Sequence, residues 1–399
     1  MNKLPLDRPA QPLAPPASAR FALWNLGFRP FYLLASVFSA FSMLLWAAQY
    51  SGYLPSAYLQ GPVWHGHEML FGYTIAVIAG FLLTAVRAWT NQPTPSGVPL
   101  MALAALWVCG RVLVLTPLDI MAAVVNAAFP VAVAVAIGMP LLRSRNVRNY
   151  FFVGLLVLMG VLVLAVHLAL RERFELSPRL GLQLALDVVL FIMAVMGGRV
   201  IPMFTNNGIP GTHATRHALV EQLALGTVML LFAADLLQWN PIVVATIALA
   251  SALMHGVRFY LWQPWRTLAT PLVWILHAAY AWIVAHLALR GLSELGLLAG
   301  SIATHALTVG AIGGLTIGMM TRTARGHTGR PLEADGFELT SYLLVQVAAL
   351  VRVFGGMTSP ELYPASIQLS ALLWAAAFGL YAIRYWPVLT RPRLDGRPG

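Results

Sequence analysis

Long apolar runs recur along the whole chain, separated by short segments rich in polar residues, proline and glycine. Each run has about 20 residues, and a helix of that length crosses the roughly 30 Å hydrocarbon layer of a membrane. The alternation of period two that marks the strands of a membrane β-barrel does not describe these runs. The runs cover residues 31–50, 66–86, 98–115, 118–142, 150–170, 180–204, 217–238, 241–262, 271–289, 298–320, 339–354 and 364–386. The pattern predicts an all-α polytopic bundle of about twelve transmembrane helices.

The count of twelve depends on the third and fourth runs, which are separated mainly by Thr116 and Pro117. A tight hairpin at this point gives twelve helices, whereas one long helix kinked at the proline gives eleven. We expect a single transmembrane domain over residues 31–386, between an N-terminal arm (residues 1–30) and a C-terminal tail (residues 387–399).

Composition and charge agree with a membrane location and also predict the orientation. Hydrophobic residues make up 59% of the chain and charged residues only 10%, whereas soluble proteins carry roughly 25% charged residues. With both termini in the cytoplasm, nineteen of the 25 Lys and Arg residues fall on cytoplasmic segments and four on outer loops. Basic residues are retained on the cytoplasmic side during insertion, so this asymmetry predicts a multi-pass protein of the bacterial inner membrane. The net charge of +11 therefore requires no nucleic-acid partner.

Two further features of the sequence limit the chemistry. The first thirty residues lack the short apolar core and small-residue cleavage site of a secretory signal, so we expect a retained cytoplasmic arm. Cys109 is the only cysteine, which excludes both an intrachain disulfide and covalent haem attachment through a Cys-x-x-Cys-His motif. A haem in this protein would have to be held by side-chain ligation alone.

Ionisable side chains inside transmembrane helices are costly, so each is a functional candidate. In the predicted topology, seven of them lie toward the periplasm: His65, His67, Glu68, His167, Asp187, His286 and His305. Neutral imidazole is a good ligand for haem iron and for copper, and several histidines at one depth indicate a metal site. We expect His65, His67, His167, His286 and His305 to supply its ligands.

The densest group is the sequence His65-Gly66-His67-Glu68. Residues two apart on a helix differ by about 200° of rotation, so both histidines cannot face one axial position. Glu68 could orient an imidazole or carry a proton, and the alternative is an interfacial hydrogen-bonded cap that includes Trp64.

Two further pairs of residues are candidates for supporting roles. Asp187 and His167 could form a proton relay, although a buried interhelical hydrogen bond is the favoured interpretation. Arg199 and Arg322 lie near the predicted inner boundary, where an arginine can reach headgroups or bind haem propionates. Glycines on the second and tenth runs indicate close helix packing more than room for a macrocycle.

Four motifs resemble the NnrS family of bacterial membrane proteins. They are residues 25–31 (NLGFRPF), 64–72 (WHGHEMLFG), 198–205 (GRVIPMFT) and 326–332 (GHTGRPL), and the resemblance runs from about residue 20 to 390. Residues 86–91 (VRAWTN) depart from the family's Pro-Asn-Trp-Thr-Gly pattern, which affects a loop and leaves the histidines intact. The resemblance implies a haem protein, with copper also associated with the family, that acts in nitric oxide metabolism or tolerance during denitrification or nitrosative stress.

Two classes of function remain open at this point. The chain could be a haem protein that binds nitric oxide, or turns it over as an oxidoreductase with an unknown electron donor. It could instead be a transporter or metal-homeostasis protein whose histidines bind copper or haem in passage. For a b-type haem we expect His67 and His305 as axial ligands, with His286 in reserve and then His255 and His277.

Overall fold

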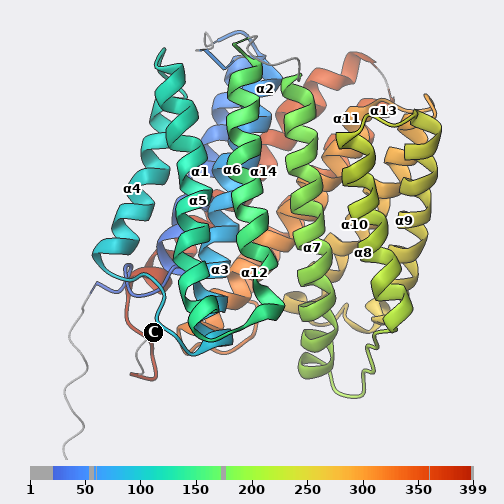
Figure 1. Ribbon diagram of the computed structural model, residues 1–399. Helices are drawn as coiled ribbons and strands as arrows, with labels where there is room; N and C mark the ends of the chain where they lie inside the picture. Colours follow the sequence, from blue (N-terminus) through green and yellow to red (C-terminus); the bar gives the residue numbers. More distant parts are fainter. Residues whose placement is uncertain (1–20, 54–57, 60, 172–176, 359, 397–399) are drawn as a thin grey trace, which may run out of the picture.

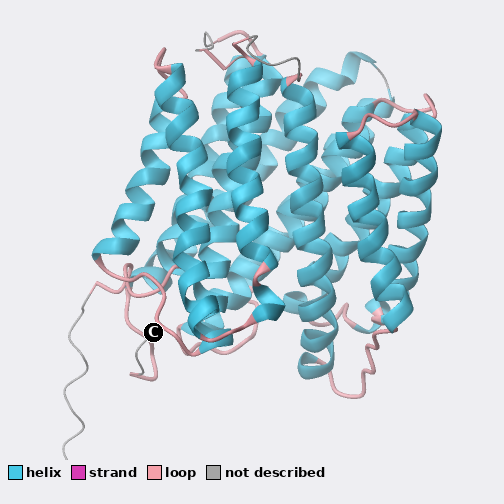
Figure 2. Ribbon diagram, viewed as in Figure 1, coloured by secondary structure: helices cyan, strands magenta, loops and turns pink. Residues whose placement is uncertain are grey.

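Helices make up almost all of the computed structural model, which describes residues 21–53, 58–59, 61–171, 177–358 and 360–396 (Figures 1 and 2). The long helices run roughly parallel or antiparallel to one another in one bundle (Figure 1). No strand occurs in the described part of the chain. The helical bundle predicted from the hydrophobic pattern is therefore confirmed, while most of the expected N-terminal arm (residues 1–20) lies outside the described residues.

The helices follow the predicted runs closely. They are α1 (Phe28–Tyr50), α2 (Gly61–His67), α3 (Ile75–Thr90), α4 (Val98–Leu113), α5 (Asp119–Arg143), α6 (Phe151–Ala169), α7 (Pro178–Gly208), α8 (Ala218–Leu236), α9 (Pro241–Leu261), α10 (Pro271–Glu294), α11 (Gly300–His305), α12 (Gly313–His327), α13 (Gly336–Thr358) and α14 (Tyr363–Thr390). Short 3₁₀ turns occupy Val147–Asn149, Pro264–Arg266 and Pro360–Leu362.

Eleven helical segments of the described chain are long and apolar enough to cross a membrane, and α4 is a shorter apolar helix. A turn at Thr116 and Pro117 separates α4 from α5, so the hairpin is confirmed and the single kinked helix is wrong. With 16 residues, α4 is about 24 Å long, and it lies along the edge of the bundle (Figure 1).

The first and last described segments meet on one face of the bundle. The backbone N–H of Ala22 donates to the carbonyl of Thr390, with 2.7 Å between nitrogen and oxygen. We call this the inner face, where α1 begins and α14 ends, and the opposite face, where α2 begins, the outer face (Figure 1). Their assignment to cytoplasm and periplasm stays a prediction from the basic residues.

Two of the crossing segments contain a π-helical stretch that the hydrophobic pattern did not predict. Glu68–Thr74 joins α2 to α3, and Ala306–Ile312 joins α11 to α12. Each stretch begins directly after a histidine, His67 in one case and His305 in the other. π-Helical turns are rare and occur frequently at functional sites.

Close packing explains the glycines of the tenth predicted helix. A Cβ on Gly310, Gly313 or Gly318 would meet side chains of α10 or α14 at less than 3 Å, including Trp374 at 2.5 Å and Ile275 at 2.9 Å. These glycines therefore let neighbouring helices approach. The outward faces carry exposed apolar side chains such as Val135 and Ile383, as expected of a lipid-facing surface.

Candidate functional site

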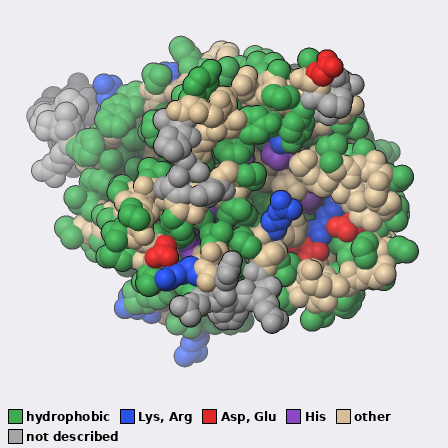
Figure 3. Space-filling view, turned by 90° about the horizontal axis from the view of Figure 1, so that it is seen from above, with side chains coloured by type: hydrophobic (Ala, Val, Ile, Leu, Met, Phe, Trp, Pro, Cys, Tyr) green, Lys and Arg blue, Asp and Glu red, His purple; other side chains and the backbone are tan. Residues whose placement is uncertain are grey.

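Four of the histidines near the outer face form two pairs, and each pair has one member on α2. The His65 ring lies 6.5 Å from the His305 ring of α11, centroid to centroid, and the two planes differ by only 8°. The Nε2 atom of His67 lies 3.0 Å from Nε2 of His167 on α6. Histidine side chains are visible in hollows of this face, between hydrophobic groups (Figure 3). The expected divergence of His65 and His67 around the helix produces these two separate pairs.

The first pair has the features of a ligand set for metal. His305 donates from Nδ1 to the carbonyl of Ser301 at 2.6 Å, which leaves Nε2 as the nitrogen with a free lone pair. A hydrogen bond of this kind fixes the tautomer and orientation of most metal-binding histidines. The ring of His65 stacks on Trp46 with centroids 4.9 Å apart, which holds the other imidazole in place. The sequence favours His67 as the partner of His305, whereas in the structure the His65 ring is the one beside His305.

The 6.5 Å between the His65 and His305 ring centroids is close to the separation of two imidazoles on opposite sides of one metal ion. Bonds of roughly 2 Å from the two imidazoles to the metal place the centroids roughly 6 Å apart when each ring points a nitrogen at it. In the described part of the chain, no group of three or more His, Cys, Asp or Glu side chains could hold a metal ion. A haem needs only axial ligands from the protein, because the porphyrin supplies the others. Two histidines are thus enough for haem.

Arg352 on α13 lies within electrostatic range of both His65 and His305. Its Nη2 donates to the hydroxyl of Tyr363 at 3.3 Å, and its side chain is 9% exposed. Its position makes it the guanidinium best placed to meet a carboxylate at the first histidine pair.

The second pair belongs to a chain of hydrogen bonds that runs into the bundle. The Tyr58 hydroxyl donates to Nδ1 of His167, whose Nε2 bonds to Nε2 of His67. His67 then donates from Nδ1 to Oε1 of Glu68 at 2.8 Å. In this arrangement each group donates to the next one, from the half-buried Tyr58 to Glu68.

Glu68 is buried and neutralised. Arg111 of α4 donates from Nη1 to Glu68 Oε1 at 2.5 Å, and its Nη2 donates to the Asn126 side chain of α5. The guanidinium also lies 5.7 Å from the Phe38 ring and 5.8 Å from the Trp107 ring. Because a buried carboxylate without a partner is strongly unfavourable, the short helix α4 has a definite role: it carries the counter-charge for Glu68.

A second buried charge cluster lies between α7, α8 and α10. Arg290 donates to Asp187 at 3.3 Å and to Asp235 at 2.5 Å. Asp187 was expected beside His167, but the structure does not bring these two residues together, because His167 bonds to Tyr58 and His67. His286 is buried nearby, with Nδ1 donating to the Ala303 carbonyl at 2.8 Å and Nε2 without a partner.

Arg199 and Arg322 do not lie at the histidine pairs. Seventeen residues separate His305 from Arg322 on one continuous helical segment, which is about 25 Å. Arg322 packs 3.8 Å from the centroid of the Phe204 ring, and Arg199 donates to Asn149 at 2.7 Å. A haem ligated near the outer face could not reach either arginine.

The inner histidines are less available. Both ring nitrogens of His255 are hydrogen-bonded, one to the Tyr280 hydroxyl at 2.6 Å and the other to the Ala224 carbonyl at 3.1 Å. His277 keeps one bond, from Nε2 to the Thr205 hydroxyl at 2.8 Å, while its Nδ1 is buried without a partner.

Sequence reasoning missed Trp46, Tyr58 and Asn126, and it also missed the roles of Arg111 and Arg352. Arg111 was visible as a charge inside an apolar run, but nothing in the sequence identified its partner. Trp46 and Tyr58 look like ordinary interfacial aromatics.

An apolar cavity of about 100 Å³ lies deeper in the bundle. Its lining comes from α1, α3, α7, α12 and the ends of both π-helical stretches: Tyr32, Thr74, Val77, Ile78, Phe81, Leu82, Val189, Ile192, Met193, Met196, Gly197, Val200, Ile312, Leu315, Thr316 and Met319. The cavity therefore begins roughly two turns below the histidine-bearing segments.

Comparison with known protein families gives one match across nearly the whole chain. The family described as NnrS protein matches residues 22–393. No curated protein matches the chain.

Proposed function

The chain belongs to the NnrS family, and from that premise we propose that it is a haem protein of the bacterial inner membrane that binds nitric oxide. Its role would be in nitric oxide metabolism or in tolerance of nitrosative stress. The observation that carries the proposal is the His65 and His305 pair, whose rings lie 6.5 Å apart and nearly parallel.

A b-type haem at this pair would supply a redox-active iron, and a diatomic gas would bind it in exchange for one of the two imidazoles. The protein's own part is to hold the two imidazoles: Ser301 fixes the tautomer of His305, and Trp46 supports His65. Arg352 is the arginine we assign to a propionate group, in place of Arg199 and Arg322.

The second pair is suited to moving a proton. The bonds from Tyr58 through His167 and His67 to Glu68 form a continuous path between a half-buried hydroxyl and a buried carboxylate. Copper could replace the proton between the two Nε2 atoms, since each imidazole has a hydrogen-bond partner at its other nitrogen. Only two protein ligands would then hold it, so we rank copper below haem.

The apolar cavity supports nitric oxide as the ligand. Nitric oxide is small and weakly polar, and it partitions into membranes. A partly open pocket of about 100 Å³ lined almost entirely by apolar side chains is large enough for such a molecule, and its lining has no charged group that would bind an ion.

The visible spectrum of the purified full-length protein tests the proposal. We expect a stoichiometric b-type haem whose reduced form changes its spectrum when nitric oxide is added. A colourless protein that retains copper would overturn the proposal and favour the alternative, a transporter or metal-homeostasis protein.

A further inference from the structure

Two motifs that are far apart in the sequence meet at the inner face. The Phe28 ring, at the start of α1, lies 5.6 Å from the ring of His327, at the end of α12. The C-terminal tail joins them, because Arg393 donates to the His327 carbonyl at 2.9 Å and Leu394 N–H donates to the Thr328 carbonyl at 3.0 Å. None of these contacts involves the histidine pairs of the outer face.

Arg29 lies at this junction, and two nitrogens of its guanidinium group have no hydrogen-bond partner. The side chain is completely buried, and Nη1 donates to the carbonyls of Leu389 and Arg391 at 2.9 and 2.8 Å. Those bonds cap the C-terminal end of α14, which is a favourable place for a cation. Nε and Nη2 of Arg29 are buried and have no partner, and the same holds for Nη1 of Arg330.

The charges around Arg29 are mostly of its own sign. Arg330 and Arg393 both act on it electrostatically, and His327 is within range of Arg29, Arg87 and Arg393. Burial and the charge of Arg325 lower the pKa of Arg330, to which Arg384 and Arg391 also contribute. Asp395 lies beside Gly329 and pairs with Arg393 at 2.6 Å.

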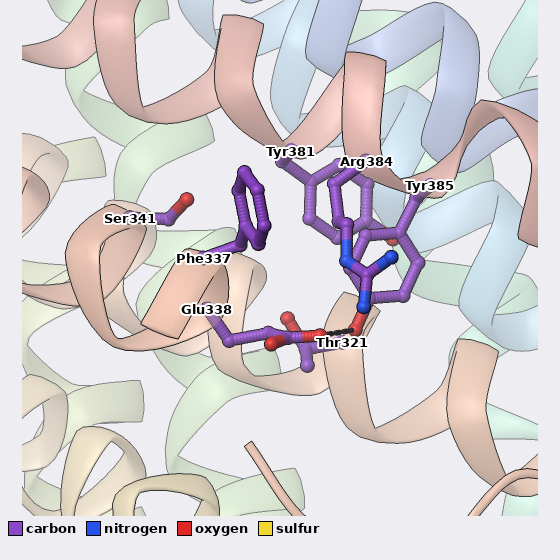
Figure 4. A pocket seen from close by; sticks show the side chains of 7 residues that line it. All are labelled: Thr321, Phe337, Glu338, Ser341, Tyr381, Arg384 and Tyr385. Atoms are coloured by element: carbon purple, nitrogen blue, oxygen red, sulfur yellow. Dashed lines mark hydrogen bonds between the residues drawn. The ribbon is translucent and has the colours of Figure 1, made fainter. Parts of the chain in front are cut away.

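In a neighbouring cluster of the same face, carboxylates neutralise the arginine charges. Glu338 accepts from the Tyr385 hydroxyl at 2.7 Å (Figure 4). It also accepts from Arg325 at 2.7 Å. Asp335 pairs with Arg384 at 2.5 Å. Within the described residues, no carboxylate pairs with Arg29 or Arg330, so their environment differs from that of Arg325 and Arg384.

The retention of basic residues on the cytoplasmic side explains why arginines lie on this face. It does not explain why Arg29 is buried beside other cations with hydrogen-bond donors that have no partner. A buried donor without a partner is unfavourable, and more so when it is charged. An oxyanion would satisfy these donors and reduce the repulsion, and the guanidinium fork matches phosphate geometry.

We propose that Arg29 and Arg330, with His327 beside them, form an oxyanion site that takes a phosphate group at the inner face. The group is either free inorganic phosphate or the headgroup of an anionic phospholipid, since both present the same acceptors. The Gly326–Arg330 motif acts as the wall of this site, and Gly329, at φ +72°, provides the turn beside Asp395 that a side chain would obstruct. The site is separate from the proposed haem function and does not depend on it.

Thermal unfolding of the full-length protein tests the free anion. In a non-ionic detergent, inorganic phosphate titrated against chloride at constant ionic strength should raise Tm by about 2–6 °C, as expected for a ligand that binds only the folded state. Arg330→Gln should lose most of that shift. Arg148→Gln is the matched control, because Arg148 is an exposed arginine of the same face.

Nanodiscs of phosphatidylcholine, with or without phosphatidylglycerol, test the lipid headgroup. A rise in Tm that needs phosphatidylglycerol and is lost in Arg330→Gln but kept in Arg148→Gln assigns the site to a lipid. Equal responses of the two variants, or no response of the wild type to either phosphate or phosphatidylglycerol, would overturn the proposal. Arg330→Lys, which keeps the charge, should recover part of the response.

Discussion

The outer and inner ends of the bundle both bury ionisable groups, but they balance them differently. Toward the outer face the buried charges have opposite partners, as in Glu68 with Arg111 and in Asp187 and Asp235 with Arg290. Buried nitrogens without a hydrogen-bond partner occur at both ends: Nε2 of His286 and Nε of Arg111 toward the outer face, and Nδ1 of His277 with nitrogens of Arg29 and Arg330 toward the inner face. What differs is the counter-charge, because Arg111 pairs with Glu68, whereas no carboxylate of the described residues pairs with Arg29 or Arg330. A guanidinium group without a counter-ion suits an anion.

The comparison depends on which face lies in the cytoplasm. An error in this topology would therefore have the largest effect of all. Nineteen basic residues on one side against four on the other predict that both termini are cytoplasmic. A reporter fused after Arg397 should report cytoplasm, and a paired reporter in the loop after α1 should report periplasm. A periplasmic carboxyl terminus would exchange the two faces and remove the haem site from the periplasmic half.

Removing the counter-charge of Glu68 should cost the most stability. Arg111→Met leaves a buried carboxylate without its cation, and we expect a loss of about 3–5 kcal/mol. Thermal unfolding and the yield of folded protein measure this. The double variant Arg111→Met with Glu68→Gln should recover much of the loss, and a double variant no more stable than Arg111→Met would show that the ion pair does not explain the effect.

Neutralising Glu68 alone should affect function more than folding. Glu68→Gln keeps the size of the side chain and an oxygen that can accept from His67 and from Arg111, and the Arg111 cation keeps Asn126 and two aromatic rings as partners. Expression and haem content should therefore stay near normal, unlike those of Arg111→Met. The nitric oxide phenotype or the redox behaviour should change, because the amide cannot take up the proton. If the only effect were less folded protein, Glu68 would be a structural cap.

The smallest expected effect concerns an exposed ion pair of the inner face. Hydrogen bonding with Glu338 and the Arg384 guanidinium hold the pKa of Asp335 below its usual value. A depressed carboxylate pKa stabilises the fold above the unfolded-state pKa, and the contribution is lost as pH falls toward the folded-state pKa. Asp335→Asn should therefore cost at most about 1 kcal/mol at pH 7 and weaken the fall of Tm between pH 5 and 3. An unchanged acid profile would contradict this.

The sequence predicted the fold well because lipid imposes a strong and simple rule on composition. Run lengths located the helices, and Pro117 marked the turn between α4 and α5. The π-helical stretches after His67 and His305 were not predictable, since their apolar composition is that of an ordinary transmembrane helix.

The site was only partly predictable, for a geometric reason. His65 and His67 differ by about 200° of rotation around the helix, so they were expected to have different neighbours, and in the structure they do. No periodicity in the sequence could predict that His305 contacts His65 and that His167 contacts His67. Depth was the more reliable guide. The predicted depth in the membrane grouped the outer histidines correctly. The same criterion places Arg199 and Arg322 far from the histidine pairs.

The most direct test of the haem assignment is the haem content and visible spectrum of purified His65→Ala and His305→Ala proteins. His213→Ala is the control, because His213 is exposed at the inner face and bonds only through its backbone. Loss of a residue that only hydrogen-bonds to a ligating imidazole lowers metal affinity by about 10–100-fold. Removing an axial ligand should therefore reduce haem content at least about tenfold or visibly change its spectrum. Full wild-type spectra in both variants would contradict the central claim that this pair holds the haem.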